Sequence, residues 1–286
     1  MSRPRRHLWA AAALVLAGCA GPVSDDAGAP GAPADVTEGT QVVTVDGTER
    51  TYRLHLPDDL DEPAPLVLLF HGLGGDAVGI EQYSEWPAVA AEHGVVLASP
   101  DGIGRSFDGG GCCGSAASEG VDDVGTALAV IDDVAERVSI DPDRVYATGF
   151  SNGGHMSYRL ACETDRFAAV APVMGARLVD CPNPDAALLH VHGMGDRSVP
   201  VAGEERPGGV VVPPAEDVVA QWRDAWACEA PTRDSDDGVH RTSASCGDRG
   251  RVDLVLLDRA GHIWPRATDG FDTTRLTWDF FAEHRR

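Results

Sequence analysis

The chain contains no lysine. Its 23 basic residues are all arginines, and 45 acidic residues outnumber them, which gives a formal net charge of −22 at pH 7. A surface this acidic repels the phosphates of nucleic acids and the anionic headgroups of lipids. We therefore expect no nucleic-acid partner, while the acidic surface by itself says nothing about a substrate.

Other features are missing as well. The sequence shows no internal repeat and no Cys-x-x-Cys pair with a matching histidine pair, so a zinc site is not expected. The apolar content of 43% and the mean hydropathy of −0.15 are typical of a soluble chain that buries a core. With 286 residues, the chain is long enough for one large domain or two ordinary ones.

The N-terminus has the composition of an export signal. Three early arginines precede an apolar run at 8–17 that is too short to span a bilayer as a mature helix. The run ends in the sequence LAGC at 16–19, which resembles the processing site of bacterial lipoproteins, and we predict lipidation of Cys19. The alternative is an ordinary secretory signal with an incidental cysteine.

This signal divides the chain into three parts. We predict a signal peptide at 1–18, a disordered tether rich in Pro, Gly, Ala and Asp at 19–38, and a folded domain at 39–286. The expected location is extracytoplasmic, on the cell membrane, with the lipid anchor as the only membrane contact. Disulfides persist in such a compartment.

Six cysteines remain in the exported chain, an even number that indicates three disulfides. Two pairs lie close together in the sequence and are expected to bond locally: Cys228 with Cys246, across a polar loop at 229–245, and Cys162 with Cys181. The adjacent Cys112 and Cys113 form either a vicinal bridge or crossed bridges with the second pair. The sequence does not choose between these two arrangements.

Apolar runs alternate with helix-length segments along the domain. A hairpin is predicted at 41–45 and 51–56, around an Asp-Gly turn. The further strands are predicted at 66–70, 95–98, 145–148, 168–173, 187–191 and 252–257. The helices are predicted at 80–92, 121–138, 154–162 and 215–226. This pattern favours an α/β fold with a mostly parallel sheet covered on both faces, whose functional groups gather at the carboxyl ends of the strands.

The first such group is Ser151, in the pentapeptide GFSNG at 149–153. The pentapeptide alone is a weak signal, but it directly follows the strand 145–148 and directly precedes the helix 154–162. Glycines on both sides of the serine allow a sharp strand-to-helix turn that exposes the hydroxyl at a helix N-terminus. We predict that Ser151 is a nucleophile; a capping serine in an ordinary turn is the alternative.

A serine nucleophile needs a base and an orienting carboxylate. Of the six histidines downstream, His262 follows the strand 252–257 at its carboxyl end, whereas the other five lie in a helix, a strand, a loop or the polar tail. Asp196 similarly follows the strand 187–191. We predict that His262 is the base and that Asp196 orients it.

Glycines after the strand 66–70, in the sequence HGLGG at 71–75, allow backbone N–H groups to point at a ligand. We predict that the N–H groups of Leu73 and Asn152 form an oxyanion hole, and that Trp86 and Trp264 line the substrate pocket. A glycine-rich phosphate loop or a plain turn is the alternative for HGLGG on its own.

Several motifs together resemble the poly(3-hydroxybutyrate) depolymerase family of esterases, including its LpqC-type lipoproteins and the related feruloyl esterases. The motifs are HGLGG (71–75), PDG (100–102), CCG (112–114), DDVG (122–125), RVYATGFSNGGHMSYRLACE (144–163), HVHGMGD (190–196) and GHIWP (261–265). The resemblance covers roughly residues 40–284. It implies an α/β-hydrolase fold, no cofactor, and the triad Ser151, Asp196 and His262.

Two departures from the family are visible. Secreted polymer depolymerases usually carry a separate substrate-binding module, which is absent here, and the stretch 106–108 replaces a Trp-Asn pair common in relatives. We predict a lidless serine ester hydrolase for short-chain, hydroxyalkanoate-oligomer or feruloyl-type esters. The alternatives are an acyltransferase or a prolyl-oligopeptidase-like peptidase with the same triad, and a non-catalytic surface binding protein.

Overall fold

The computed structural model describes residues 38–58, 60–61, 63–206 and 210–286. The predicted signal peptide, Cys19 and all but the last residue of the predicted tether lie outside the described residues. Within the described ranges, no helix combines the length and the apolar character needed to cross a membrane.

The core of the domain is one twisted sheet with the strand order β1-β2-β4-β3-β5-β6-β7-β12-β11-β10. The six central strands from β4 to β12 are parallel, and an antiparallel hairpin extends the sheet at each edge. The strands are β1 (Gly39–Val45), β2 (Thr48–His55), β3 (Ala64–Phe70), β4 (Val96–Pro100), β5 (Ile140–Phe150), β6 (Ala169–Val173), β7 (Ala187–Gly193), β10 (Thr232–Asp236), β11 (Val239–Ser245) and β12 (Arg251–Leu257). A separate small hairpin pairs β8 (Glu204–Glu205) with β9 (Val211–Val212).

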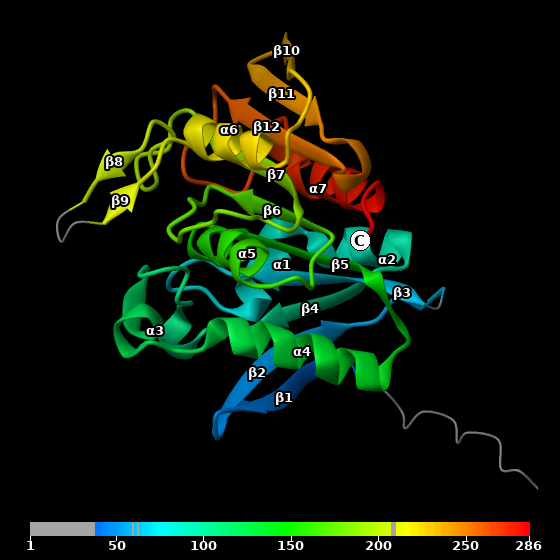
Figure 1. Ribbon diagram of the computed structural model, residues 1–286. Helices are drawn as coiled ribbons and strands as arrows, with labels where there is room; N and C mark the ends of the chain where they lie inside the picture. Colours follow the sequence, from blue (N-terminus) through cyan, green and yellow to red (C-terminus); the bar gives the residue numbers. More distant parts are fainter. Residues whose placement is uncertain (1–37, 59, 62, 207–209) are drawn as a thin grey trace, which may run out of the picture. The chain divides into compact units, whose positions relative to one another are not determined.

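Helices cover both faces of the sheet, as Figure 1 shows. One face carries α1 (Ala77–Ser84), α2 (Trp86–His93) and α7 (Thr273–Ala282); the other carries α4 (Asp123–Arg137), α5 (Asn152–Glu163) and α6 (Ala215–Ala225). The short α3 (Gly114–Glu119) precedes α4. Every residue of β3, β4, β6 and β7 is buried, because both faces of these strands lie under helices. The predicted α/β fold is confirmed.

The predicted helix 80–92 is wrong as a single element. The structure ends α1 at Ser84 and begins α2 at Trp86, because Glu85 between them has the left-handed φ of 60°. Pro87 lies in the first turn of α2, where the missing N–H does no harm, whereas a continuous helix would place the ring against the preceding turn.

The predicted polar loop 229–245 is also wrong. It forms the hairpin of β10 and β11, which pairs with β12 at the edge of the sheet. The Cys228–Cys246 disulfide closes the base of this hairpin, and a Cys162–Cys181 disulfide joins the end of α5 to the segment before β7. The third disulfide joins Cys112 to Cys113, so the vicinal arrangement is the one present.

The C-terminal tail, predicted to be polar, forms α7 and packs behind β6 and β7. His284 is buried in it; its Nε2 accepts a hydrogen bond from the N–H of Arg251 at 3.0 Å, and its carbonyl accepts one from the hydroxyl of Tyr146 at 2.8 Å. His284 therefore belongs to the core, whereas Glu283, Arg285 and Arg286 around it are exposed.

The parallel pairing brings the carboxyl ends of the six central strands to one edge of the sheet. In register, Phe70 pairs with Gly149, Phe150 with Val173, and Gly193 with Leu257. No helix or strand occupies residues 174–186, all of which are described, so no cap domain is inserted between β6 and β7. The loops that follow these strands therefore meet at this edge.

Candidate active site

Ser151 lies at the sharp turn between β5 and α5. Its φ of 56° and ψ of −112° are rare for a residue with a side chain, which is the strained geometry expected of a nucleophile at a strand-to-helix turn. A Cβ on Gly149 would lie 2.6 Å from the carbonyl carbon of Gly153, and a Cβ on Gly153 would run into the carbonyl oxygen of Phe70. Only glycine at these two positions lets helix and strand approach so closely.

The structure brings Ser151, His262 and Asp196 into one hydrogen-bonded series. Nε2 of His262 lies 2.8 Å from Oγ of Ser151, and Nδ1 of His262 lies 2.7 Å from Oδ2 of Asp196. The carboxylate of Asp196 has no exposed surface, whereas the side chain of His262 is 22% exposed. A base that faces both the nucleophile and an open surface can pass a proton between Ser151 and an incoming substrate.

Asp196 is held as a carboxylate by its surroundings. Burial by itself raises the pKa of this carboxyl, but hydrogen bonds from His192, His262 and the Val199 N–H outweigh burial and lower the pKa well below its ordinary value. Oδ1 accepts from the backbone N–H groups of Ser198 at 2.8 Å and Val199 at 2.9 Å. The charge needed to orient His262 is therefore present at neutral pH.

A second histidine reaches Asp196 from the opposite direction. Nε2 of His192 lies 2.7 Å from the carbonyl oxygen of Val199 and 3.3 Å from Oδ2 of Asp196. Because both neighbours only accept, Nε2 of a neutral His192 carries the hydrogen, and Nδ1 is left to accept.

That assignment fixes a buried hydrogen-bond chain in one direction. His190 donates from Nε2 to Nδ1 of His192 at 2.9 Å, and the hydroxyl of Tyr158 donates to Nδ1 of His190 at 2.5 Å. Burial lowers the pKa of His190 well below its ordinary value, which keeps its ring neutral. The i, i+2 spacing of His190 and His192 puts both rings on one face of the strand that leads to Asp196, and this spacing is the sequence signal for the contact.

The two predicted oxyanion donors border Ser151. Asn152 begins α5, so its N–H has no carbonyl partner within its own helix. The loop that carries Leu73 runs along the turn, since a Cβ on Gly72 would lie 3.5 Å from the Cβ of Ser151. Gly74 and Gly75 donate to the carbonyls of Arg105 and Gly72, and in the described part of the chain the Leu73 N–H meets no backbone acceptor.

The prediction that Trp86 and Trp264 line the pocket is wrong for this structure. Both side chains are completely buried. The Trp86 ring stacks on Phe281 of α7, and the Trp264 indole N–H donates to Oγ1 of Thr274 at 3.0 Å. Large apolar rings that lie close to the site in sequence turn into the core because burial of their surface stabilises the fold.

One group of described residues has metal-ligand chemistry, formed by Cys112, Cys113 and His155, whose ligand atoms lie within 4.8 Å of one another. The two sulfurs are joined to each other in the disulfide. Because the thiolate is the form of cysteine that binds metals, this group does not fit a metal ion in the oxidised protein.

We expect the thermal stability to fall as the solution pH falls from about 6.5 toward 4. Burial lowers the pKa of His155 to about 4, and hydrogen bonding to Ala176 only partly offsets this. In this window the unfolded chain binds a proton that folded His155 does not, so acid favours unfolding. Melting temperatures across the window measure this loss in the wild type and in His155→Asn, which removes the histidine but none of the titrating carboxylates. Equal pH slopes for the two proteins would contradict the assignment.

Comparison with known proteins relates the chain to esterases. A family model described as the prolyl oligopeptidase family matches residues 81–181, which include the turn at Ser151. The putative esterase NocK of Nocardia uniformis subsp. tsuyamanensis is 33% identical over 274 residues, covering 82% of this chain and 76% of that protein. A probable feruloyl esterase C of Aspergillus terreus is 32% identical over 164 residues, covering 54% of this chain and 57% of that protein.

Among solved structures, the acetyl xylan esterase from Aspergillus awamori superposes with a TM-score of 0.64. It is 14% identical to this chain, and the match covers 85% of this chain and 99% of that one. At so low an identity, the similarity shows a shared fold alone. The similarity to NocK, by contrast, combines enough sequence identity with enough coverage of both chains to show the family. The chain belongs to the serine esterases of α/β-hydrolase fold, in the family of the putative esterase NocK.

Proposed function

We propose that this ester hydrolase works through an acyl-enzyme on Ser151 and acts outside the cytoplasm on short-chain, hydroxyalkanoate-oligomer or feruloyl-type esters. The observation that carries the mechanism is the continuous series of hydrogen bonds from Ser151 through His262 to Asp196. The motifs shared with polyhydroxybutyrate depolymerases and the similarity to feruloyl esterases support the substrate class.

In the first half of the reaction, Oγ of Ser151 attacks the ester carbonyl carbon while Nε2 of His262 takes the hydroxyl proton. The carbonyl oxygen becomes an oxyanion beside the N–H groups of Leu73 and Asn152. Collapse of this intermediate breaks the bond to the alcohol, which leaves with the proton from His262. Water then repeats the sequence on the acyl-enzyme and releases the acid.

The open edge of the sheet supports a small or aromatic acyl group. Because the described residues between β6 and β7 form no cap, we expect no walled apolar tunnel that would bury a fatty chain, each methylene of which would contribute about 0.8 kcal/mol. A cavity of about 680 Å³ opens beside the loop that carries His262, and charged side chains such as Asp236, Arg241 and Arg259 line it together with Ile263. Its charged lining suits a polar group better than an alkyl chain, and the triad residues themselves do not line it.

The substrate proposal is tested with p-nitrophenyl esters whose acyl chains range from two to sixteen carbons. We expect kcat/KM to be highest at the short end, with comparable values for feruloyl esters and no rise in rate above the micellar threshold, since no lid has to open. A maximum at long chains, or activation at an oil–water interface, would overturn the substrate proposal while leaving the esterase assignment intact.

A peptidase is the second candidate, because the match to the prolyl oligopeptidase family covers the turn at Ser151. The same panel extended with peptidyl p-nitroanilides separates the two activities. Ester turnover without amide turnover is the expected result. An added alcohol acceptor that diverts product from acid to new ester would reveal the acyltransferase alternative.

We also propose that Cys19 carries a lipid anchor, on the strength of the LAGC sequence at 16–19. Cys19→Ser should block lipidation and maturation at this site, whereas the mature wild-type protein should enter the detergent phase of a phase partition. Mass spectrometry of the N-terminal peptide reports the acyl groups directly. Wild-type protein in the aqueous phase with an unmodified N-terminus would refute the anchor.

A further inference from the structure

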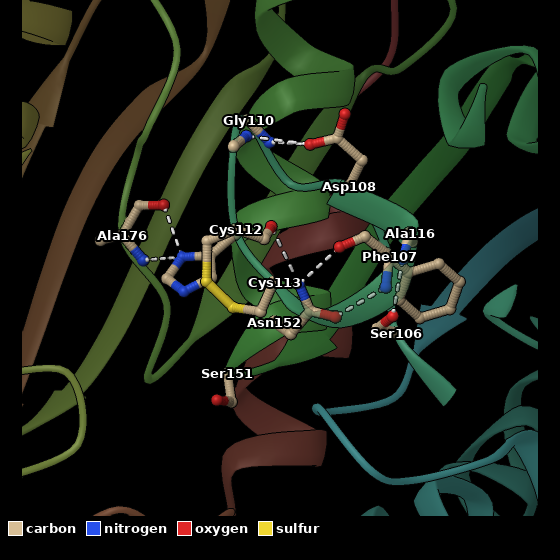
Figure 2. The surroundings of a disulfide bond; sticks show 12 residues. Ser106, Phe107, Asp108, Gly110, Cys112, Cys113, Ala116, Ser151, Asn152 and Ala176 are labelled. Atoms are coloured by element: carbon tan, nitrogen blue, oxygen red, sulfur yellow. Dashed lines mark hydrogen bonds between the residues drawn. A yellow bond between two sulfur atoms is a disulfide. The ribbon is translucent and has the colours of Figure 1, made fainter. Parts of the chain in front are cut away.

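The vicinal disulfide lies in a segment that contacts both sides of the proposed oxyanion hole. We call residues 105–114 the 105–114 segment; it follows β4 and leads into α3. Figure 2 shows the Cys112–Cys113 disulfide beside the side chain of Asn152, which is the residue after Ser151. The mechanism above gives this segment no role.

The first contact of the segment is with Asn152. This side chain is completely buried, and both of its polar atoms are used. Oδ1 accepts from the N–H of Phe107 at 2.7 Å, while Nδ2 donates to the carbonyls of Phe107 at 2.8 Å and Cys112 at 3.2 Å. The residue that supplies one proposed oxyanion donor from its backbone is thus fixed to the segment through its side chain.

The second contact is with the loop that carries Leu73. The N–H of Gly74 donates to the carbonyl of Arg105 at 2.8 Å, and Nε of Arg105 donates to the carbonyl of Gly75 at 3.2 Å. At the other end of the segment, a Cβ on Gly114 would lie 3.0 Å from Cδ1 of Leu73. The segment therefore holds the loop of the other proposed donor at two points.

The disulfide lies in the part of the segment to which the Asn152 side chain is hydrogen-bonded. The carbonyl of Phe107 also accepts from the N–H of Cys113 at 3.2 Å, and the carbonyl of Cys112 accepts from the N–H of Gly109 at 2.7 Å. Both carbonyls that Asn152 binds are thereby tied to residues of the disulfide turn. Joining the sulfurs of Cys112 and Cys113 limits the rotation of the Cys112 carbonyl, and so limits the movement of Asn152.

We propose that the 105–114 segment, closed by the Cys112–Cys113 disulfide, is a positioning element of the oxyanion hole, coupled to the nucleophile turn by the Asn152 side chain. The inference rests on the proposed function, because it assumes that an oxyanion forms at this place. The disulfide and the amide side chain do not touch the reacting atoms; they keep the two N–H donors at a fixed separation. Donors fixed in advance stabilise the oxyanion without reorganising during the reaction.

The test compares the double variant C112S/C113S with C228S/C246S, which removes the disulfide at the base of the β10–β11 hairpin. With p-nitrophenyl acetate, we expect C112S/C113S to lower kcat by about 10- to 100-fold, less than the roughly 10²–10³-fold typical of losing a whole donor. KM should change less than about twofold, because the lost interaction belongs to the transition state. The control should keep the wild-type kcat per titrated active site.

Inhibition by a boronic acid provides a second measurement, which a purely structural role of the disulfide would not change. Phenylboronic acid forms a tetrahedral adduct with Oγ of a catalytic serine and places an oxygen in the oxyanion hole. Its inhibition constant should rise in C112S/C113S by about the factor by which kcat/KM falls. Unchanged boronate affinity, or a loss of activity that only follows the loss of folded active sites, would overturn the proposal.

Asn152→Ala provides a second route, since it keeps the backbone N–H and removes only the side-chain contacts. It should lower kcat in the same way, and combining it with C112S/C113S should add little, because both act through the carbonyl of Cys112. Fully additive effects would show independent roles and refute the coupling. An inactive wild type that no fluorophosphonate labels would refute the proposed function instead, so the two failures are distinguishable.

Discussion

Ser151→Ala is expected to abolish ester hydrolysis, with kcat/KM falling by about 10⁶-fold toward the background rate. The reason is that the variant lacks both the attacking atom and the hydroxyl that His262 faces at 2.8 Å. The fold should survive, because alanine keeps the Cβ that the strained turn already accommodates at a φ of 56°. His262→Ala should behave similarly, since the triad acts as a unit.

Two measurements check this result. Turnover of p-nitrophenyl acetate is compared with circular dichroism of the same sample, and a fluorophosphonate should label the peptide that contains Ser151 in the wild type only. Ser118→Ala is the matched control, since this exposed serine of α3 bonds only to the carbonyl of Ser115 at 3.0 Å. Near-wild-type turnover by a well-folded Ser151→Ala protein would place the nucleophile elsewhere.

The central strands and the turn at Ser151 could be predicted because their signals are local. A strand buried on both faces is typically a continuous apolar run, and β3 and β6 are such runs. The glycines at 149 and 153 belong to the turn itself, so the strand, the serine and the helix can be read from one short stretch. The grouping of Ser151, Asp196 and His262 then follows from the parallel order of the strands.

What could not be predicted depends on partners distant in the sequence. Every residue of β10 is exposed, so it has no apolar alternation, and it forms a strand only because β11 pairs with it and the Cys228–Cys246 disulfide closes the hairpin. Trp264 lies two residues after His262 in the sequence, but only α7, which was not predicted, shows that Trp264 and Trp86 belong to the core. The contacts of Asn152 likewise require the position of the 105–114 segment.

Asp196→Asn is expected to lower kcat/KM by about 10⁴-fold although it changes a single atom. The backbone decides which way the new amide faces. Because the N–H groups of Ser198 and Val199 both point at Oδ1, the amide oxygen of asparagine has to stay there to accept from them. The amide nitrogen therefore replaces Oδ2, between His262 and His192.

This orientation places a donor where both histidines need an acceptor. The new N–H₂ forces Nδ1 of His262 to accept, so the hydrogen of the ring moves to Nε2 and points at Oγ of Ser151, which leaves no lone pair to take the serine proton. On the other side, the N–H₂ opposes Nε2 of His192 and works against the direction of the buried chain from Tyr158.

Asp258→Asn is the matched control, because Asp258 pairs with His240 at 2.9 Å on the surface; it should leave turnover unchanged. The two variants are compared by kcat/KM per titrated active site and by the rate of fluorophosphonate labelling. If Asp196→Asn kept activity within about tenfold of the wild type, Asp196 would not be setting the tautomer of His262, and the proposed division of roles in the triad would be wrong.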